Sequence, residues 1–255
     1  MKVTIIGAGN VATQLALGLK KVGHEIVEVY NRSDESGQEL ARTVGASFTS
    51  KAGELKDAEV YIIAVKDDTL AEVAGHLKLG NKTVVHTSGT KSKDLLKDSA
   101  IGFGVFYPLQ TMTKYSKVDF KTVPILVEGS SEPVVQRLEM LARSLSHHVH
   151  RVDEEQRKWI HVAAVFANNF TNHLWALAEG ILKERGISFD ILKPLIMKSA
   201  QNLEGASPTA IQTGPAIRGD HQLVQEHLLM LTHDPKLHKL YRILSESISK
   251  SPLKE

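Results

Sequence analysis

The stretch of sequence that decides the fold is MKVTIIGAGNVA, residues 1–12. Most of residues 2–6 are β-branched, which is typical of a short strand. Gly7 and Gly9 follow directly, and apolar residues from Val11 to Val22 then recur at the spacing of a helix. The opening therefore predicts a strand, a tight glycine turn and a helix in immediate succession.

The same alternation continues to about residue 150. The expected strands are 2–6, 25–30, 59–65, 83–86 and 102–106. Two closing strands, 122–127 and one around Val149, are expected on either side of a helix over 132–145, after a loop-rich segment from 107 to 121. Strands that alternate with helices favour βαβ units and a largely parallel sheet, so the predicted class is α/β with a Rossmann-type sheet.

The strand signal ends after Asp153, and the rest of the chain predicts helices. Apolar residues recur at helical spacing between 159 and 181, which indicates one long helix. Further helices are expected over 189–203, with Pro194 delaying or kinking the start, after Asp220 as N-cap, and after Asp234 and Pro235. We expect an all-α domain over 153–255 behind a sheet domain over 1–152, with a frayed tail at 249–255.

Composition excludes several classes of function. A net charge of +2 gives no general field for nucleic acid, and the basic residues form no stripe interleaved with aromatics. The chain has no cysteine, so disulfides and thiolate chemistry are excluded and redox chemistry would require a bound cofactor. No leader and no membrane span are recognisable, and we expect a cytoplasmic protein with a small-molecule substrate.

The glycine turn has the context that a dinucleotide-binding fingerprint requires, directly between a strand and a helix. Gly7 permits the turn, Gly9 lets a pyrophosphate approach the backbone, and Ala12 lets helix and strand pack closely. Asn10 and Val11 open the helix, whose N-terminus offers amide donors. A purely structural glycine turn is the alternative.

The second strand ends in Asn31, Arg32 and Ser33, where an NAD enzyme would offer an acid to the ribose hydroxyls. An arginine and a small hydroxyl group suit a 2′-phosphate instead, because a guanidinium binds it in a fork. The sequence therefore predicts NADP as cofactor, with an exposed surface arginine as the alternative.

Two later loops leave the same sheet edge and should face the nicotinamide half of the cofactor. Ala64, Val65 and Lys66 end the fourth strand, and Asp67 follows them. The segment 86–89, His-Thr-Ser-Gly, ends the fifth. Lys66 and Asp67 could equally form a solvated loop and a helix cap.

With these pieces, the chain resembles the superfamily of 6-phosphogluconate and β-hydroxyacid dehydrogenases, ketopantoate reductases and pyrroline-carboxylate reductases. More closely, it resembles the family of NADP oxidoreductases that joins a Rossmann-like domain to a DUF2520 domain. The motifs that carry the resemblance are residues 7–12, HTSG at 86–89, FYPLQ at 106–110, NN at 168–169 and TGPAIRGD at 213–220.

The resemblance implies a helical second domain that forms a homodimer and a substrate bound between the nicotinamide and the long helix. It makes Thr87, Ser88 and Gly89 substrate contacts. In hydroxyacid dehydrogenases that helix carries a catalytic lysine one turn before an asparagine; aligning Asn168 and Asn169 with the asparagines places Val165 at the lysine position. Valine transfers no proton, so the usual lysine mechanism is not expected here.

Several polar residues are candidates for the chemistry. His161 could act as a general acid near neutral pH, and Asn169 could orient a substrate or only fix helix packing. Arg218 could clamp a substrate anion or only bridge to Asp220, which could also cap a helix. The remaining candidates for substrate contacts are Tyr107, Gln110, Asn168 and Asp220. For His147, His148 and His150 we reject a metal site, because no third ligand is identifiable beside the two that share a strand face.

These observations predict an NADP-dependent oxidoreductase that transfers a hydride to or from a small polar carbonyl, imine or hydroxy acid. The missing lysine keeps a second hypothesis open, a sensor or regulatory subunit that binds NADP without catalysis. A third keeps the fold and changes the electron partner, as in deazaflavin-dependent NADP reductases.

Overall fold

The structure, a computed structural model, describes residues 1–249; the rest of the predicted frayed tail lies outside the described residues. The chain forms two compact units, Met1–Ala167 and a second unit that begins at Asn168. These units divide within a helical run, whereas the predicted domain boundary at 152–153 lies before it. That boundary stays a prediction.

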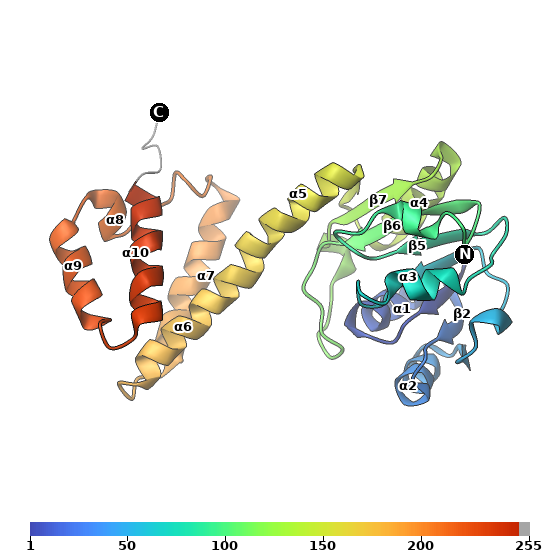
Figure 1. Ribbon diagram of the computed structural model, residues 1–255, viewed down its shortest axis with the longest axis horizontal. Helices are drawn as coiled ribbons and strands as arrows, with labels where there is room; N and C mark the ends of the chain where they lie inside the picture. Colours follow the sequence, from blue (N-terminus) through green and yellow to red (C-terminus); the bar gives the residue numbers. More distant parts are fainter. Residues whose placement is uncertain (250–255) are drawn as a thin grey trace. The chain divides into compact units, whose positions relative to one another are not determined.

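The first unit is built on a single eight-stranded sheet (Figure 1). Its strands are β1 Lys2–Ile6, β2 Glu25–Tyr30, β3 Ser47–Thr49, β4 Val60–Ile63, β5 Thr83–His86, β6 Gly102–Pro108, β7 Ile125–Gly129 and β8 Val149–Arg151. They lie in the order β3-β2-β1-β4-β5-β6-β7-β8, and every pairing is parallel except that of β6 with β7. The predicted Rossmann-type, mostly parallel sheet is confirmed.

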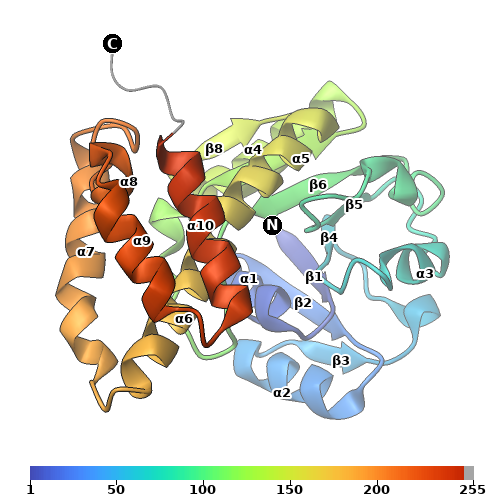
Figure 2. The same cartoon turned by 60° about the vertical axis from the view of Figure 1, so that its left-hand side comes forward.

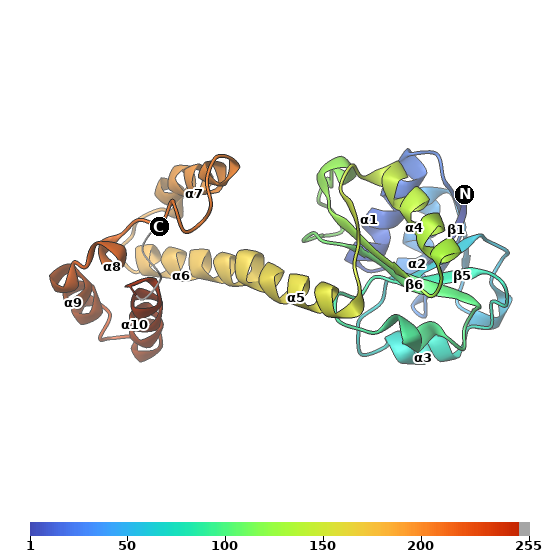
Figure 3. The ribbon, with the colours of Figure 1, turned by 90° about the horizontal axis from the view of Figure 1, so that it is seen from above.

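Helices cover both faces of this sheet. Those of the first unit are α1 Asn10–Lys21, α2 Asp34–Val44, α3 Leu70–Gly75, α4 Glu132–Leu145 and α5 Glu154–Ala164. In Figure 3, α1 and α4 lie on one side of the sheet and α3 on the other. Two buried apolar clusters result, because successive strand residues point to opposite faces: Ile5 packs with α1, α2 and α4, and Ile6 packs with α3.

The second unit contains helices and turns, and no strand among its described residues. A π-helix, η4 Val165–Phe170, crosses the unit boundary, followed by α6 Thr171–Lys183, α7 Lys193–Gln201, α8 Pro215–Arg218, α9 His221–Met230 and α10 Pro235–Ser249. Three short 3-10 turns lie in the first unit, η1 Ala52–Glu54, η2 Lys93–Leu96 and η3 Phe120–Thr122, and two in the second, η5 Phe189–Leu192 and η6 Asn202–Glu204. Helices α8, α9 and α10 pack together (Figure 2).

Local sequence signals explain the helix starts. Asp153 caps α5 in a full capping box with Gln156, and the Asp220 carboxylate accepts the backbone N–H of Leu223 at the start of α9. Asp234 accepts from Leu237 ahead of α10. The expected caps at Asp220 and Asp234 are therefore confirmed.

Three sequence expectations are wrong in detail. Strand β6 runs on to Pro108, so Tyr107 lies in a strand and not in the loop-rich segment expected from residue 107. The strand expected over 122–127 starts three residues later, because residues 120–122 form a 3-10 turn whose cap, Asp119, accepts the backbone N–H of Lys121. The single helix expected between 159 and 181 is interrupted by the π-helix, which the apolar periodicity does not reveal. Among residues 1–249, no helix has the length and apolar character that a membrane crossing requires.

The glycine turn makes a direct test of the fold possible. Gly7 has φ +116°, and a Cβ there would lie 2.4 Å from the Ala64 carbonyl oxygen, whereas a Cβ on Gly9 meets nothing within 4 Å. We expect Gly7→Ala to lower the free energy of unfolding by at least about 1–3 kcal/mol, because strain and a backbone clash add. Gly9→Ala is the matched control and should cost less than about 1 kcal/mol. Urea unfolding measures both, and equal losses would contradict this account of the turn.

Candidate functional site

A cleft of about 850 Å³ lies at the carboxyl edge of the sheet in the first unit. It is lined by residues 7–11, 30–32, 64–69, 73, 87–89, 107 and 161. These segments lie at the end of β2 or follow β1, β2, β4 and β5, and single residues come from α3, β6 and α5. Parallel strands place their following loops at one edge, which is where open α/β sheets bind ligands.

The glycine turn forms the middle of the cleft. The amide of Gly7 donates to the Tyr30 carbonyl oxygen at 2.8 Å, which ties the turn to the end of β2. Gly9 is the N-cap of α1, and no side chain caps this helix. Residues 9–11 line the cleft, so the residues present fit a pyrophosphate bound at a helix N-terminus.

The end of β2 supplies one end of the cleft. Arg32 lines it and pairs through Nη1 with the Glu72 carboxylate at 3.0 Å, with both side chains more than half exposed. Asn31 also lines the cleft and donates through Nδ2 to the Ser33 carbonyl oxygen at 2.8 Å. Ser33 is the residue before α2, where its side chain makes no capping hydrogen bond, and it lies outside the lining residues.

The other end of the cleft is formed by residues from the β4, β5 and β6 side of the sheet. In the strand order, β2 lies on one side of β1 and these three strands lie on the other. Ala64, Val65 and Lys66, from the loop after β4, line this half. Asp67 also lines it and accepts a hydrogen bond from the Thr90 hydroxyl at 2.9 Å. That bond joins the loops after β4 and β5.

The segment Thr87-Ser88-Gly89 lines the same half. The Ser88 hydroxyl oxygen accepts hydrogen bonds from the backbone amides of Thr90 and Lys91, and these bonds stabilise the loop to which Ser88 belongs. The buried His86 accepts the Ser88 amide on Nδ1 and contacts the Ser92 carbonyl oxygen through Nε2. Burial lowers the pKa of His86 to about 4. It is therefore neutral near pH 7 and fixes the loop with Nε2 as donor.

A tyrosine and a histidine meet at this end of the cleft. The Tyr107 hydroxyl on β6 lies 3.0 Å from His161 Nδ1 on α5. Gly89 packs against both: a Cβ at this position would lie 2.6 Å from His161 Nδ1 and 3.0 Å from Tyr107 Cζ. Burial raises the pKa of Tyr107, and the negative charge of Asp67 raises it further, so its phenol stays protonated near neutral pH.

The structure does not bring all predicted residues into the cleft. Gln110 is exposed outside the lining, and its side-chain oxygen accepts the Thr111 amide. The remaining four belong to the second unit: Asn168 and Asn169 lie in the exposed π-helix, Arg218 ends α8 and Asp220 caps α9. Among the described residues, no ion pair joins Arg218 to Asp220. The position of Asp220 is explained by its capping of α9, and this cap does not explain Arg218.

Sequence reasoning missed Arg157 and Glu128. Arg157 on α5 is fully buried, with Nη1 3.3 Å from the Ser88 carbonyl oxygen and Nη2 3.1 Å from the Glu128 carboxylate on β7. No motif marks them, because they are 29 residues apart and meet only in the fold. The one available signal was the position of Arg157 one helical turn before His161. Among residues 1–249, no group of three or more His, Cys, Asp or Glu residues could hold a metal ion.

The chain is similar to known families and solved structures along nearly its whole length. Residues 2–89 match the family described as "NADP oxidoreductase coenzyme F420-dependent", and residues 123–248 match the "Domain of unknown function (DUF2520)". A structure described as a "putative NADP oxidoreductase" from Bacteroides fragilis is 42% identical, with a TM-score of 0.90 and 98% of each chain covered. The curated proteins that were compared include no match.

Two more distant structures share the fold. A 1-pyrroline-5-carboxylate reductase of Streptococcus pyogenes is 19% identical, with a TM-score of 0.66 and 98% of each chain covered. An imine reductase of Myxococcus stipitatus in complex with NADP+ is 16% identical, with a TM-score of 0.61, and covers 98% of this chain and 92% of that one. Taken with the dinucleotide cleft, the match along nearly the whole chain shows that it belongs to the family of NADP-dependent oxidoreductases that joins a Rossmann-type domain to a DUF2520 domain.

Proposed function

We propose that this NADP-dependent oxidoreductase reduces the C=N or C=O bond of a small polar substrate, with Tyr107 as the proton donor. The observation that carries the proposal is the Tyr107–His161 hydrogen bond at the end of the cleft opposite Arg32. The pyrroline-carboxylate and imine reductases that share this fold are named for C=N substrates, and that favours an imine among the candidates.

The fit of the cofactor sets which end of the cleft holds the chemistry. A 2′-phosphate at Arg32 and a pyrophosphate at the glycine turn leave the half beyond β1 for the nicotinamide. NADPH supplies a hydride when it is bound there. The residues at this end are Thr87, Ser88, Gly89, Tyr107 and His161.

The protein must then supply a proton to the nitrogen or oxygen of the reduced bond. When His161 Nδ1 carries its hydrogen and donates to the phenol oxygen, the Tyr107 O–H is free to point into the cleft. The phenol gives its proton to the substrate, and the same His161 hydrogen bond stabilises the resulting phenolate. In this scheme His161 supports the donor, and a proton from solvent restores the phenol after turnover. This role of His161 is more specific than the general acid predicted from sequence.

Asn168, Asn169, Arg218 and Asp220 lie outside this cleft, so their predicted substrate contacts stay predictions. These predictions are that Asn168 and Asn169 orient the substrate and that Arg218 binds an anionic group on it. Helix α5 and the π-helix belong to one helical run in the sequence, and π-helices occur frequently at functional sites.

We also propose that the second unit forms a homodimer, in the cytoplasm. Among residues 168–249 only Leu228 is buried, while Leu174, Ile191, Leu195 and Met197 are among its exposed apolar side chains. Monomeric proteins rarely expose so much apolar surface. Sedimentation equilibrium should give twice the chain mass, and a strictly monomeric protein would contradict this part of the proposal.

The catalytic proposal is tested by following NADPH oxidation with a panel of cyclic imines, ketones and 2-oxo acids. We expect Tyr107→Phe to lower kcat about 10²- to 10⁴-fold, because positioned proton donors contribute rate factors of that size. The NADPH dissociation constant should change less than about threefold, under 1 kcal/mol. Tyr115→Phe is the matched control, because this tyrosine is 90% exposed and outside the cleft.

Full activity of Tyr107→Phe would refute the proton-donor role. Tight NADPH binding without turnover of any substrate would favour the sensor hypothesis. Turnover with a deazaflavin alone would favour the third hypothesis, a deazaflavin-dependent NADP reductase. The family matched by residues 2–89 is described as dependent on coenzyme F420, which is a deazaflavin, and this supports that hypothesis.

Cofactor selectivity tests the role of Arg32 separately. In a calorimetric titration at one salt concentration, NADPH should bind at least about tenfold tighter than NADH, and Arg32→Ala should abolish the difference, because charged hydrogen bonds contribute about 1.5–3 kcal/mol. The exposed pair with Glu72 contributes at most about 1 kcal/mol, so a phosphate can displace it. Glu72→Gln is the control and should leave the preference intact or increased. A preference that survives Arg32→Ala would assign the phosphate contact elsewhere.

A further inference from the structure

A buried cation lies behind the nicotinamide half of the cleft. Arg157 is one of the largest fully buried side chains of the protein, and arginine is almost never fully buried unless it is paired. Its Nη2 donates to one Glu128 oxygen at 3.1 Å, and its Nη1 donates to the Ser88 carbonyl oxygen at 3.3 Å. Its Nε, also buried, has no hydrogen-bond partner.

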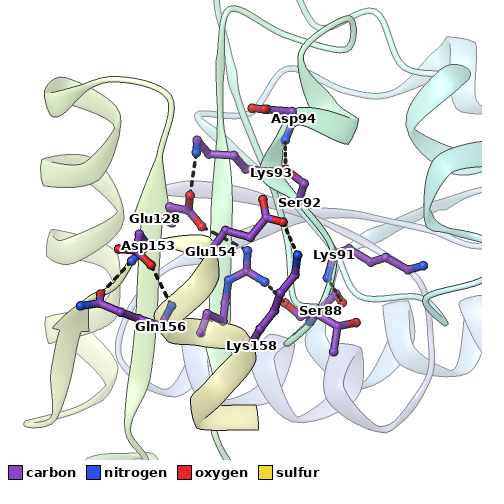
Figure 4. Close-up of polar contacts among 12 residues, drawn as sticks. Ser88, Lys91, Ser92, Lys93, Asp94, Glu128, Asp153, Glu154, Gln156 and Lys158 are labelled. Atoms are coloured by element: carbon purple, nitrogen blue, oxygen red, sulfur yellow. Dashed lines mark hydrogen bonds and ion pairs between the residues drawn. The ribbon is translucent and has the colours of Figure 1, made fainter. Parts of the chain in front are cut away.

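Glu128 joins this arginine to a second cation. Its other carboxylate oxygen accepts from Lys93 Nζ at 2.6 Å, and the glutamate itself is 8% exposed. Figure 4 shows Lys93, Glu128 and Ser88 around the start of α5. The carboxylate on β7 therefore anchors both ends of segment 88–93: Lys93 directly, and Ser88 through Arg157.

Stability alone does not account for this arrangement. Two cations share one anion, and burying charges costs free energy that an apolar set of similar volume would not require. The guanidinium, however, reaches two groups at once in a fixed fork, which an apolar side chain cannot do. What it holds is a backbone carbonyl in the loop that lines the cleft.

The held segment contacts the proposed reacting pair. Gly89, next to Ser88, packs against Tyr107 and His161. Arg157 and His161 are four residues apart on α5 and share one face of the helix. The helix thus meets the loop at two points, one fixed by Arg157 and one occupied by the histidine.

We propose that Arg157 is a positioning residue, which holds the Ser88–Gly89 backbone against α5 so that the cleft keeps the shape that orders the nicotinamide ring. The proposal rests on the proposed function in one respect, the assignment of this end of the cleft to the nicotinamide. It requires no step of catalysis.

The test compares a cofactor with the same cofactor lacking its nicotinamide. The variant is Arg157→Met combined with Glu128→Gln, so that no unpaired carboxylate stays buried. We expect the dissociation constant of 2′-phospho-ADP-ribose to stay within about threefold. The enhancement of nicotinamide fluorescence at saturating NADPH should fall by at least about half, because the ring is no longer held in one environment.

Two further variants keep the test decisive. Arg151→Met is the matched control, because Arg151 pairs with Glu132 and Glu139 on the surface, and it should change neither quantity. If the double variant does not fold, Arg157→Lys keeps a cation beside Glu128 and loses the fork to Ser88. We expect the same selective loss of fluorescence enhancement from it.

An unchanged fluorescence enhancement in the folded variants would overturn the proposal. A loss of 2′-phospho-ADP-ribose binding as large as the loss of fluorescence enhancement would also overturn it, because that result indicates general damage to the cleft. Absence of any enhancement in the unmodified protein would overturn it as well. Each of these outcomes is independent of Tyr107→Phe kinetics, so a failure of the proton-donor role is distinguishable from a failure of this one.

Discussion

The close approach of Gly7 to the Ala64 carbonyl oxygen is the constraint on which the rest of this structure depends. The chain must leave β1, turn sharply and enter α1 while it passes against the end of β4, and no side chain fits at that point. The positive φ of Gly7 makes the turn possible. The result is an uncapped helix N-terminus in the middle of the sheet edge, with loops from β2 on one side and from β4 and β5 on the other.

Charges are placed differently at the two ends of the cleft. Arg32 and Glu72 form an exposed pair that costs little to break, which suits a residue that must exchange its partner for a ligand. Arg157, Glu128 and Lys93 form a buried network, in which losing one partner leaves an uncompensated charge. An exchangeable contact thus lies at the end proposed for the 2′-phosphate, and a fixed framework lies at the end proposed for the chemistry.

Sequence patterns predicted the elements whose signals are local. Strands β1, β2 and β5 and helix α4 have the predicted bounds, because β-branched runs, glycines and caps mark their ends. The strand β3 and the helix α3 were not predicted, because three and six residues offer little periodicity. Helix α2 was also not predicted, although its buried residues 37, 40, 41 and 44 recur at helical spacing. The π-helix was not predictable, because a wider turn changes hydrogen bonding while the sequence stays apolar and polar in helical alternation. Gln110 was predicted to contact the substrate because it belongs to the FYPLQ motif at 106–110. It is exposed instead, and its position depends on the path of the chain after β6.

By itself the sequence determined the sheet topology class, the dinucleotide turn and the cofactor, because these follow from residue type and spacing within a few positions of one another. It also named Tyr107, Ser88, Gly89 and His161, without a physical reason to group them. Only the tertiary structure decided that these four lie together and that Arg157 and Glu128 stand behind them. The physical reason is that they come from β5, β6, β7 and α5, and their distances depend on strand order and helix packing, which no local pattern specifies.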